Sequence, residues 1–333
     1  GKHASRNMTL AEAEFTMTQF LSGNARPEQI GAVFMLLRVL EETSEELAGF
    51  AKAINKHWPE GSARYDLVWA SYAGKRRQPM WWALSAKLLT DMGYKILVHG
   101  TLSHTQGRIY AHEVFEALGW PSLSREQVSS SDAPLAYLPC AEIHPLLQEW
   151  LGLKSVLGVR SPINTVLKTI APDGVASVQG IFHPNYRPLH LGAAALNGDI
   201  AMVIKGEGGE FEVNPERKCV AGFEWPSSAY SHQHPGNDDE VEEVEHVAAS
   251  NELKAQNTIT IANTQSHYDD KTDDISPESL KAFWLGESES EYAQSAVLNT
   301  AALALCAMRR SNEFEQAFAD CTQAWLQRDK SAL

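Results

Sequence analysis

The chain has 333 residues, of which 44% are hydrophobic and 21% are charged, so it can bury a large core and exceeds the usual domain size of about 100–200 residues. Two lobes are therefore expected. Lysine and arginine total 28 against 42 aspartate and glutamate residues, which gives a formal net charge of −14. This balance works against nonspecific attraction to nucleic acid or anionic membranes, unless the basic residues gather on one surface.

No apolar stretch in the sequence approaches the roughly 20 residues that span a bilayer, and residues 1–6 lack the apolar core of a signal peptide. The four cysteines are widely spaced and form no Cys-x-x-Cys pair; they are Cys140, Cys219, Cys306 and Cys321. We therefore expect reduced, partly buried thiols in a cytoplasmic protein that has no membrane partner.

Helices are predicted throughout the first part of the chain. Two capping boxes, in which a threonine precedes a glutamate by three residues, begin the first and third of these helices: Thr9 with Glu12, and Thr43 with Glu46. Pro27 suits the first turn of the helix between them. We expect these segments to form a small helical lobe over residues 1–62, which parts of residues 144–170 join.

From residue 66 onward, short apolar runs alternate with helix signals. Strands are expected near residues 67–70, 96–98, 135–138, 175–182 and 200–204, and helices near 79–92, 109–118, 277–286, 291–309 and 312–327. This alternation predicts an α/β lobe over residues 63–333 with a mainly parallel sheet. The polar stretches 227–240 and 265–276 are predicted to be exposed loops, and the acidic run 238–245 a solvated helix face.

Several motifs follow one another along the chain. Val98-His99-Gly100 ends a strand, Leu157-Gly158-Val159-Arg160 precedes Asn164, and Gly180-Ile181-Phe182-His183-Pro184 comes after them. In this order they resemble motifs of the anthranilate phosphoribosyltransferases, and collinear matches extend from residue 15 to residue 212. The resemblance implies the fold of that family, a homodimer joined through the helical lobe, and a ligand site in the cleft between the lobes. Ligands of open α/β sheets generally bind beyond the carboxyl ends of the strands.

The residues that would hold 5-phosphoribosyl pyrophosphate depart from that family. Its glycine-rich Gly-Thr-Gly-Gly-Asp loop falls on residues 71–75, Ser-Tyr-Ala-Gly-Lys, and its Asn-Ile-Ser-Thr segment falls on residues 80–83, Met-Trp-Trp-Ala. The family's Mg²⁺-binding Asp-Glu pair falls near Glu207 and Glu210, the candidate metal ligands if phosphoribosyl pyrophosphate is bound. The arginine that contacts anthranilate falls on Lys154. Close backbone approach and hydroxyl contacts to the diphosphate would therefore be reduced.

These departures resemble more closely a second branch of the same fold, a DNA-damage-associated bacterial group that lacks the biosynthetic activity and binds nucleic acid without sequence preference. The matching features are the basic residues 71–78, the shortened Val98-His99-Gly100 motif, Arg108 at the next helix start, and residues 209–215. This resemblance implies a nucleic-acid partner.

The candidate residues of the loop also have structural interpretations. The adjacent cations Lys75, Arg76 and Arg77 fit contact with nucleic-acid phosphates, contact with a small phosphorylated ligand, or simple solvation. Trp81 and Trp82 could stack on bases, but core packing is the expectation, because adjacent helical residues point about 100° apart and at least one must face inward.

Histidines could serve as an acid, a base or a ligand contact. His99 is the candidate catalytic residue because of its family position and a reference pKa of about 6.5; the alternative is a strand-end histidine bonded to a backbone carbonyl. His183 is expected to be structural. His232 and His234 lack a recognised spacing of metal ligands.

Two functions follow from different features of the chain. The first is a homodimer that binds nucleic acid through clustered cations, which include Lys87 and Lys95. The second is an enzyme that transfers a phosphoribosyl group, with Mg²⁺ as cofactor and anthranilate or another small molecule as acceptor. The candidate binding residues for either function are Gly74, Lys75, Arg76, Arg77, Gly100, Arg108, Lys154, Arg160 and Asn164. The loss of glycines and hydroxyls from the loop favours the first function.

Overall fold

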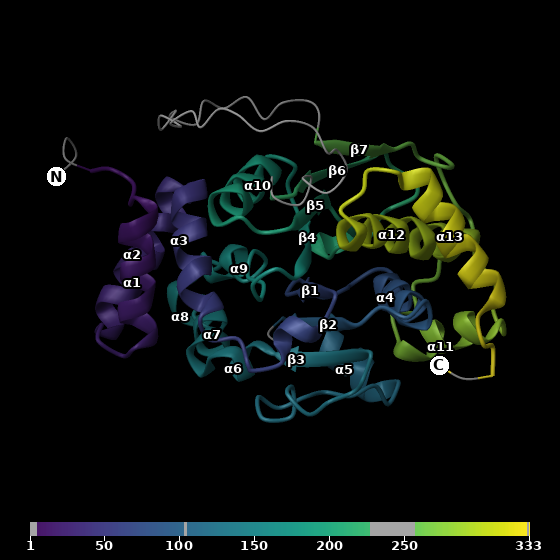
Figure 1. Ribbon diagram of the computed structural model, residues 1–333, viewed down its shortest axis with the longest axis horizontal. Helices are drawn as coiled ribbons and strands as arrows, with labels where there is room; N and C mark the ends of the chain where they lie inside the picture. Colours follow the sequence, from purple (N-terminus) through teal and green to yellow (C-terminus); the bar gives the residue numbers. More distant parts are fainter. Residues whose placement is uncertain (1–4, 103–104, 227–256, 332) are drawn as a thin grey trace, which may run out of the picture.

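The structure, a computed structural model, describes residues 5–102, 105–226, 257–331 and 333. Figure 1 shows the first three helices together on one side of the molecule, and the strands with the C-terminal helices on the other. The molecule is therefore a small N-terminal helical lobe beside a larger α/β lobe, as the sequence predicts.

Seven strands form one sheet in the order β3-β2-β1-β4-β5-β6-β7. The first five along the chain run parallel, and the last two pair antiparallel. The strands are β1 (Leu67–Ser71), β2 (Ile96–Gly100), β3 (Leu135–Pro139), β4 (Ala176–Ile181), β5 (Ala201–Lys205), β6 (Cys219–Glu224) and β7 (Thr258–Ile261). The order reverses between β1 and β4, and the carboxyl ends of strands at such a switch point form the usual ligand site of open α/β sheets.

Strands β1, β2 and β4 are buried along their whole length, because helices cover both faces of the sheet. Leu67 and Trp69 of β1 enter the core of the C-terminal helices, and Val68 and Ala70 enter the core of the helical lobe. The helices on the face of the sheet that carries Leu67 and Trp69 are α4 (Trp81–Asp91), α5 (Ala111–Ala117), α11 (Pro277–Leu285), α12 (Glu291–Arg309) and α13 (Phe314–Gln327).

The helical lobe is built from α1 (Leu10–Leu21), α2 (Pro27–Leu40) and α3 (Ser44–Asn55), with the short helices α7 (Pro145–Leu151), α8 (Lys154–Leu157) and α9 (Ile163–Val166) beside them (Figure 1). Phe20, Phe34 and Trp150 form an edge-to-face aromatic cluster between these segments. The remaining helical elements are η1 (Ser62–Arg64), α6 (Cys140–Ile143), α10 (Tyr186–Asn197) and η2 (Glu207–Gly209).

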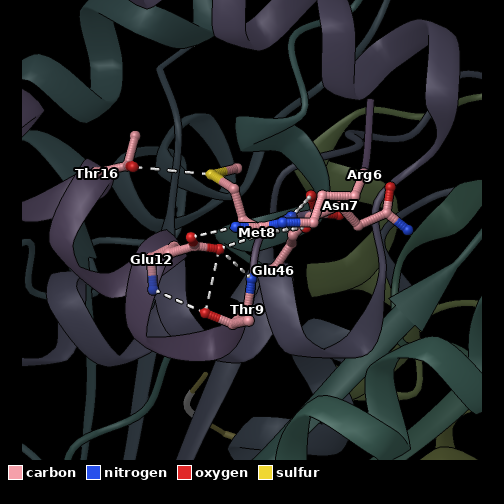
Figure 2. Close-up of polar contacts among 7 residues, drawn as sticks. All are labelled: Arg6, Asn7, Met8, Thr9, Glu12, Thr16 and Glu46. Atoms are coloured by element: carbon pink, nitrogen blue, oxygen red, sulfur yellow. Dashed lines mark hydrogen bonds and ion pairs between the residues drawn. The ribbon is translucent and has the colours of Figure 1, made fainter. Parts of the chain in front are cut away.

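Both predicted capping boxes are present at the starts of α1 and α3. In the first, Thr9 and Glu12 each accept from the backbone N–H of the other. Figure 2 shows that Arg6 also reaches Glu12, with Nη2 2.6 Å from Oε1. Glu46 of the second box accepts from the N–H of Met8 at 3.0 Å, which ties the entry of α1 to the start of α3.

The strands and helices expected near the stated positions are confirmed, but α10, β6 and β7 were not predicted, and neither were the short elements α6, η1 and η2. Helix α10 contains Pro188 in its first turn, which gives the sequence the look of a loop. Strand β6 carries Gly222 in its interior, and β7 is only four residues long. Short antiparallel edge strands give weak sequence signals because only one face is buried, as the alternating burial of β7 shows.

The apolar residues of the helical lobe are divided between its core and its surface. Phe20, Phe34 and Leu37 are buried within the lobe, so they need no second chain. Phe15 remains 66% exposed. The large apolar side chains that remain exposed on this lobe are Phe15, Leu36, Val39, Leu40 and Val156.

Other sequence expectations have mixed outcomes. Trp81 and Trp82 are core residues, and Trp82 stacks on Trp69 with ring centroids 5.1 Å apart. All four cysteines are buried and free. Residues 265–276 form the predicted loop, whereas residues 227–240 with His232 and His234, and the whole of the acidic run 238–245, lie outside the described residues. Among the described residues, no helix is long and apolar enough to cross a membrane.

Candidate functional site

The loop between β1 and α4 lies at the switch point of the sheet, where sequence analysis places the phosphate site. Gly74 has a φ of +67°, and a Cβ there would lie 3.0 Å from the carbonyl oxygen of Ile109. Lys75 and Ile109 exchange backbone hydrogen bonds of 2.8 and 2.9 Å. The loop is therefore held tightly against the chain that leads into α5.

The carboxylate of Glu210 binds this loop. Its Oε1 accepts from the backbone N–H groups of Ala73 and Gly74, both at 2.7 Å, and the residue is 1% exposed. Residues 206–212 approach β4 this closely because Gly180 has no side chain: a Cβ there would lie 2.2 Å from the carbonyl carbon of Glu210. Two successive N–H groups that could cradle a phosphate thus already bind a carboxylate.

A second carboxylate, that of Glu212, binds the start of α4. Its Oε2 accepts from the N–H of Trp82 at 2.9 Å, and its Oε1 forms an ion pair with Lys75. Both charged side chains are buried. Burial raises the pKa of Glu212 to about 7, while Lys75 acts in the opposite direction. The N-terminus of α4, a natural phosphate site, therefore also carries an internal anion.

These contacts change the expected roles of three residues. Lys75 is a buried partner of Glu212 rather than a surface cation, so the expectation of three adjacent exposed cations is wrong at its first member. Glu210 binds the loop, and Glu207 accepts from Asn214 Nδ2 at 2.7 Å. Among the described residues, no three His, Cys, Asp or Glu side chains gather to hold a metal ion. These carboxylates do not fit Mg²⁺, which requires several oxygen ligands in an octahedron.

His99, the candidate catalytic residue, is fully buried at the carboxyl end of β2. Its Nδ1 lies 2.9 Å from the hydroxyl oxygen of Tyr72, and its ring packs edge-on against Trp58. Burial lowers the pKa of His99 to about 3, so the imidazole is neutral at physiological pH. Gly100 follows it, and a Cβ there would lie 2.4 Å from Ser71 O. His99 therefore has no surface for direct contact with a ligand, in contrast to the sequence expectation.

The other predicted cations divide into two groups. Arg76 and Arg77 are exposed, and neither forms a salt bridge with any residue within the described ranges. Arg108 instead donates from Nη1 to the carbonyl oxygens of Ala73 and Gly74, both at 2.9 Å, so it braces the loop. Two further candidates lie elsewhere, since Lys87 pairs with Asp91 on α4 and Lys95 precedes the amino end of β2.

A cavity of about 260 Å³ lies beside the loop, between the helical lobe and β4. Lys168 lines it, donating from Nζ to the carbonyl oxygens of Gly180 at 2.5 Å and Gly209 at 2.9 Å. Burial lowers the pKa of Lys168 to about 8, and Glu210 opposes this shift. The ring of Phe182 lies 5.5 Å from Lys168 Nζ and 5.4 Å from the guanidinium of Arg160. The cavity is thus lined by cations.

The remaining predicted site residues fall around this cavity. Arg160 and Asn164 line it, and Asn164 donates from Nδ2 to Ser161 O at 3.2 Å. Lys154 is exposed on α8 and does not line it. His183, expected to be structural, is exposed and lines the cavity. Sequence reasoning missed Lys168, for which the available signal was one lysine within the mostly apolar residues 166–171.

Comparisons with known proteins agree with this geometry. Residues 2–57 match a glycosyl transferase family, helical bundle domain. The anthranilate phosphoribosyltransferase of Anaeromyxobacter sp. (strain Fw109-5) is 26% identical over 210 residues, which cover 61% of this chain and 62% of that protein. The uncharacterized protein YbiB of Escherichia coli (strain K12) is 27% identical over 227 residues, which cover 65% of this chain and 71% of that protein.

Solved structures share the fold over nearly the whole chain. The anthranilate phosphoribosyltransferase (TrpD) of Thermus thermophilus has a TM-score of 0.73 at 17% identity, covering 96% of this chain and 92% of that one. The Saccharomyces cerevisiae enzyme in complex with PRPP and Mg has a TM-score of 0.67 at 15% identity, covering 96% and 88%.

The chain is a homologue of the anthranilate phosphoribosyltransferases. The sequence match spans less than two thirds of the Anaeromyxobacter enzyme. YbiB matches a larger share of both chains than this enzyme does. The matched relatives thus include a protein that is not named as an anthranilate phosphoribosyltransferase.

Proposed function

We propose that this protein has the phosphoribosyltransferase fold with a degenerate diphosphate site, and that it binds nucleic acid without sequence preference as a homodimer. One observation carries the first part of the proposal: internal carboxylates occupy the N–H groups of Ala73, Gly74 and Trp82. A diphosphate would have to displace two buried side chains to reach those donors. The transferase alternative therefore lacks support at the binding of the diphosphate.

The surface cations support the second part. Four basic residues of the loop and of the cavity beside it are exposed and form no salt bridge with a residue that the structure describes; they are Arg38, Arg76, Arg77 and Arg160. Unpaired arginines are free to bind phosphates. Because charges are screened over about 8 Å at physiological salt, a local cluster can attract phosphates despite the net charge of −14.

An assay of pyrophosphate release from phosphoribosyl pyrophosphate plus anthranilate, with Mg²⁺, tests the first part. We expect no turnover above background, because each lost transition-state contact reduces the rate by about 10²–10³-fold. Efficient turnover would show that Glu210 and Glu212 leave the loop when substrate arrives, and would establish the transferase alternative.

A DNA-binding titration at several salt concentrations tests the second part. We expect the double variant Arg76→Ala/Arg77→Ala to weaken binding and to reduce the salt slope by about two phosphate units. The matched control is Lys95→Ala/Lys330→Ala, which removes two exposed cations, one at the amino end of β2 and the other near the C-terminus. Equal affinities and slopes for the two variants would exclude Arg76 and Arg77 from the interface.

The cavity beside Lys168 supports a second candidate, a small phosphorylated ligand. Lys168 donates two hydrogen bonds to carbonyls, and an ammonium group has a third N–H available. Arg38 and Arg160 also line the cavity. Inorganic phosphate and ribose 5-phosphate should raise the thermal midpoint of the parent but not of Lys168→Met. If neither compound raises the thermal midpoint of the parent, the cavity does not bind an anionic ligand of this kind.

A further inference from the structure

A second cavity, of about 430 Å³, opens beside the same loop and shares no lining residue with the first. Arg77 and Gln78 contribute to it from the loop, and Glu207, Asn214, Glu216 and Arg217 from the chain between β5 and β6. The polar loop 265–276 and Tyr292 of α12 complete it. We call it the loop cavity.

Gln78 marks the loop cavity as a site for a polar ligand. The residue is 8% exposed, and its Oε1 is buried without a hydrogen-bond partner in the structure. An unpaired buried amide oxygen is unfavourable, and a ligand that donates a hydrogen bond to it would relieve this cost. Since an amide both donates and accepts, a hydroxyl or the edge of a nucleobase is a suitable partner.

The charges of the loop cavity leave two arginines available. Glu216 is neutralised by Lys271, with Nζ 2.7 Å from Oε1, and accepts from the N–H of Tyr268 at 3.1 Å. Arg77 and Arg217 are exposed, and no described residue forms a salt bridge with either. The lining thus combines free cations for a phosphate with amides for uncharged polar groups.

Three acidic residues of the lining remain, and their positions fit uncharged polar groups better than a phosphate. Asp269 is fully exposed, so water screens its charge, and Asp273 is exposed as well. Glu207 accepts from Asn214 Nδ2 and is half-buried. Carboxylates of this kind accept from ribose hydroxyls and exocyclic amines. A phosphate is therefore expected at the arginines and not deeper in the cavity.

We propose that the loop cavity holds one nucleotide unit of single-stranded nucleic acid, with its phosphate on Arg77 and Arg217 and its base or sugar against Gln78. The inference rests on the proposed nucleic-acid function and assigns a subsite to it. A single strand is required, because a base that is paired and stacked in a duplex cannot enter a cavity without being extruded.

Two variants test the subsite in binding titrations with a single-stranded oligodeoxyadenylate and with its duplex. Gln78→Leu keeps the side-chain volume and removes the amide; we expect it to weaken single-strand binding about five- to tenfold and to leave duplex binding unchanged. Arg217→Ala should weaken single-strand binding and lower its salt slope by about one. The control is Lys218→Ala, which removes the neighbouring exposed cation outside the lining.

The outcomes separate the subsite from the proposed function. If Gln78→Leu and Arg217→Ala bind single strands as tightly as Lys218→Ala does, while Arg76→Ala/Arg77→Ala loses affinity, the loop cavity is not a nucleotide site and the proposed function stands. Equal loss on single strands and duplex also overturns the subsite. If the parent binds neither, the proposed function fails. Should Gln78→Leu not fold, Arg217→Ala and competition by adenosine monophosphate decide the question.

Discussion

Lys75 and Glu212 form an ion pair from which water is excluded, and this pair determines the character of the loop. Taking two charges out of water is costly, and their attraction compensates only when both partners remain. The pair also connects residues 137 positions apart in the chain. At this scale the loop is a structural junction, in which a lysine stabilises the carboxylate that binds the start of α4.

A double-mutant cycle tests this junction. Lys75→Met leaves a buried carboxylate without its partner, so the free energy of unfolding should fall by about 3–5 kcal/mol. Glu212→Gln leaves the buried ammonium group without its partner and should lower the free energy of unfolding by a similar amount. The double variant Lys75→Met/Glu212→Gln should recover most of the loss, because a neutral pair of the same size needs no charge compensation. Urea unfolding measures all four proteins. Losses that simply add would show that the two residues are energetically independent.

The pH dependence of stability follows from the raised pKa of Glu212. A carboxyl group whose pKa is about 7 in the fold and about 4.5 in the unfolded chain favours the fold in its protonated form. Its contribution is complete below about pH 4.5 and is lost as the pH rises through about 7. The urea midpoint of the parent should therefore fall relative to that of Glu212→Gln between pH 5 and pH 8, as unfolding series at both ends of this range would record. A constant difference would contradict the shift.

At the scale of the element, the beginnings of the helices show how local sequence couples to tertiary structure. The two capping boxes look alike in the sequence but differ in burial, since Glu46 is 3% exposed and the side chain of Glu12 is 45% exposed. Glu46 accepts from Thr43 and from the N–H of Met8, so it serves two helices. Glu12 serves α1 alone, with Arg6 as its additional partner.

We expect this difference to appear in stability. Glu12→Ala should lower the free energy of unfolding only slightly, because its carboxylate is open to water, which screens its contacts. Glu46→Ala should cost about 2 kcal/mol, because it leaves the partly buried N–H groups of Thr43 and Met8 without an acceptor. Thermal or urea unfolding of the two variants, measured side by side, provides the comparison. A larger loss for Glu12→Ala would refute the coupling between α1 and α3.

Local patterns predicted the helices and the parallel strands because their signals lie within a few residues. The capping boxes and the apolar runs of β1 and β2 are examples. The same reasoning placed the site at the carboxyl ends of the strands. It could not assign Lys75, since three adjacent cations suggest a solvated patch unless the distant Glu212 is known to lie beneath the loop. Lys168 was missed for the same reason: its acceptors are carbonyls of Gly180 and Gly209.

At the scale of the whole molecule, the helical lobe carries an uncovered apolar surface. Leu36, Val39 and Leu40 on α2 and Phe15 on α1 are each more than half exposed, whereas the aromatic residues beneath them are buried. Contiguous apolar surface of this kind commonly marks a protein interface. This surface, which lies at the end of the molecule remote from α13 (Figure 1), supports the proposed homodimer.

The double variant Leu36→Glu/Val39→Glu should convert the dimer into a monomer, because it places four like charges across a symmetric apolar contact. Leu326→Glu is the control, since Leu326 is 73% exposed on α13 at the far end and should leave the assembly unchanged. Sedimentation velocity at micromolar concentration distinguishes the species. A monomeric parent would contradict the homodimer itself. A double variant that sediments as the parent dimer does would place the interface elsewhere.

The buried pair has a consequence for how this sequence can evolve. A change to a glycine-rich loop requires replacement of Lys75, and that single step would strand the charge of Glu212 in the interior. The cost of about 3–5 kcal/mol is a large part of the roughly 5–15 kcal/mol that stabilises a typical domain. Changing Glu212 first meets the same penalty with the opposite charge. Both mutational orders therefore pass through a poorly folded intermediate, so natural selection would tend to preserve the present loop even if a diphosphate ligand became useful.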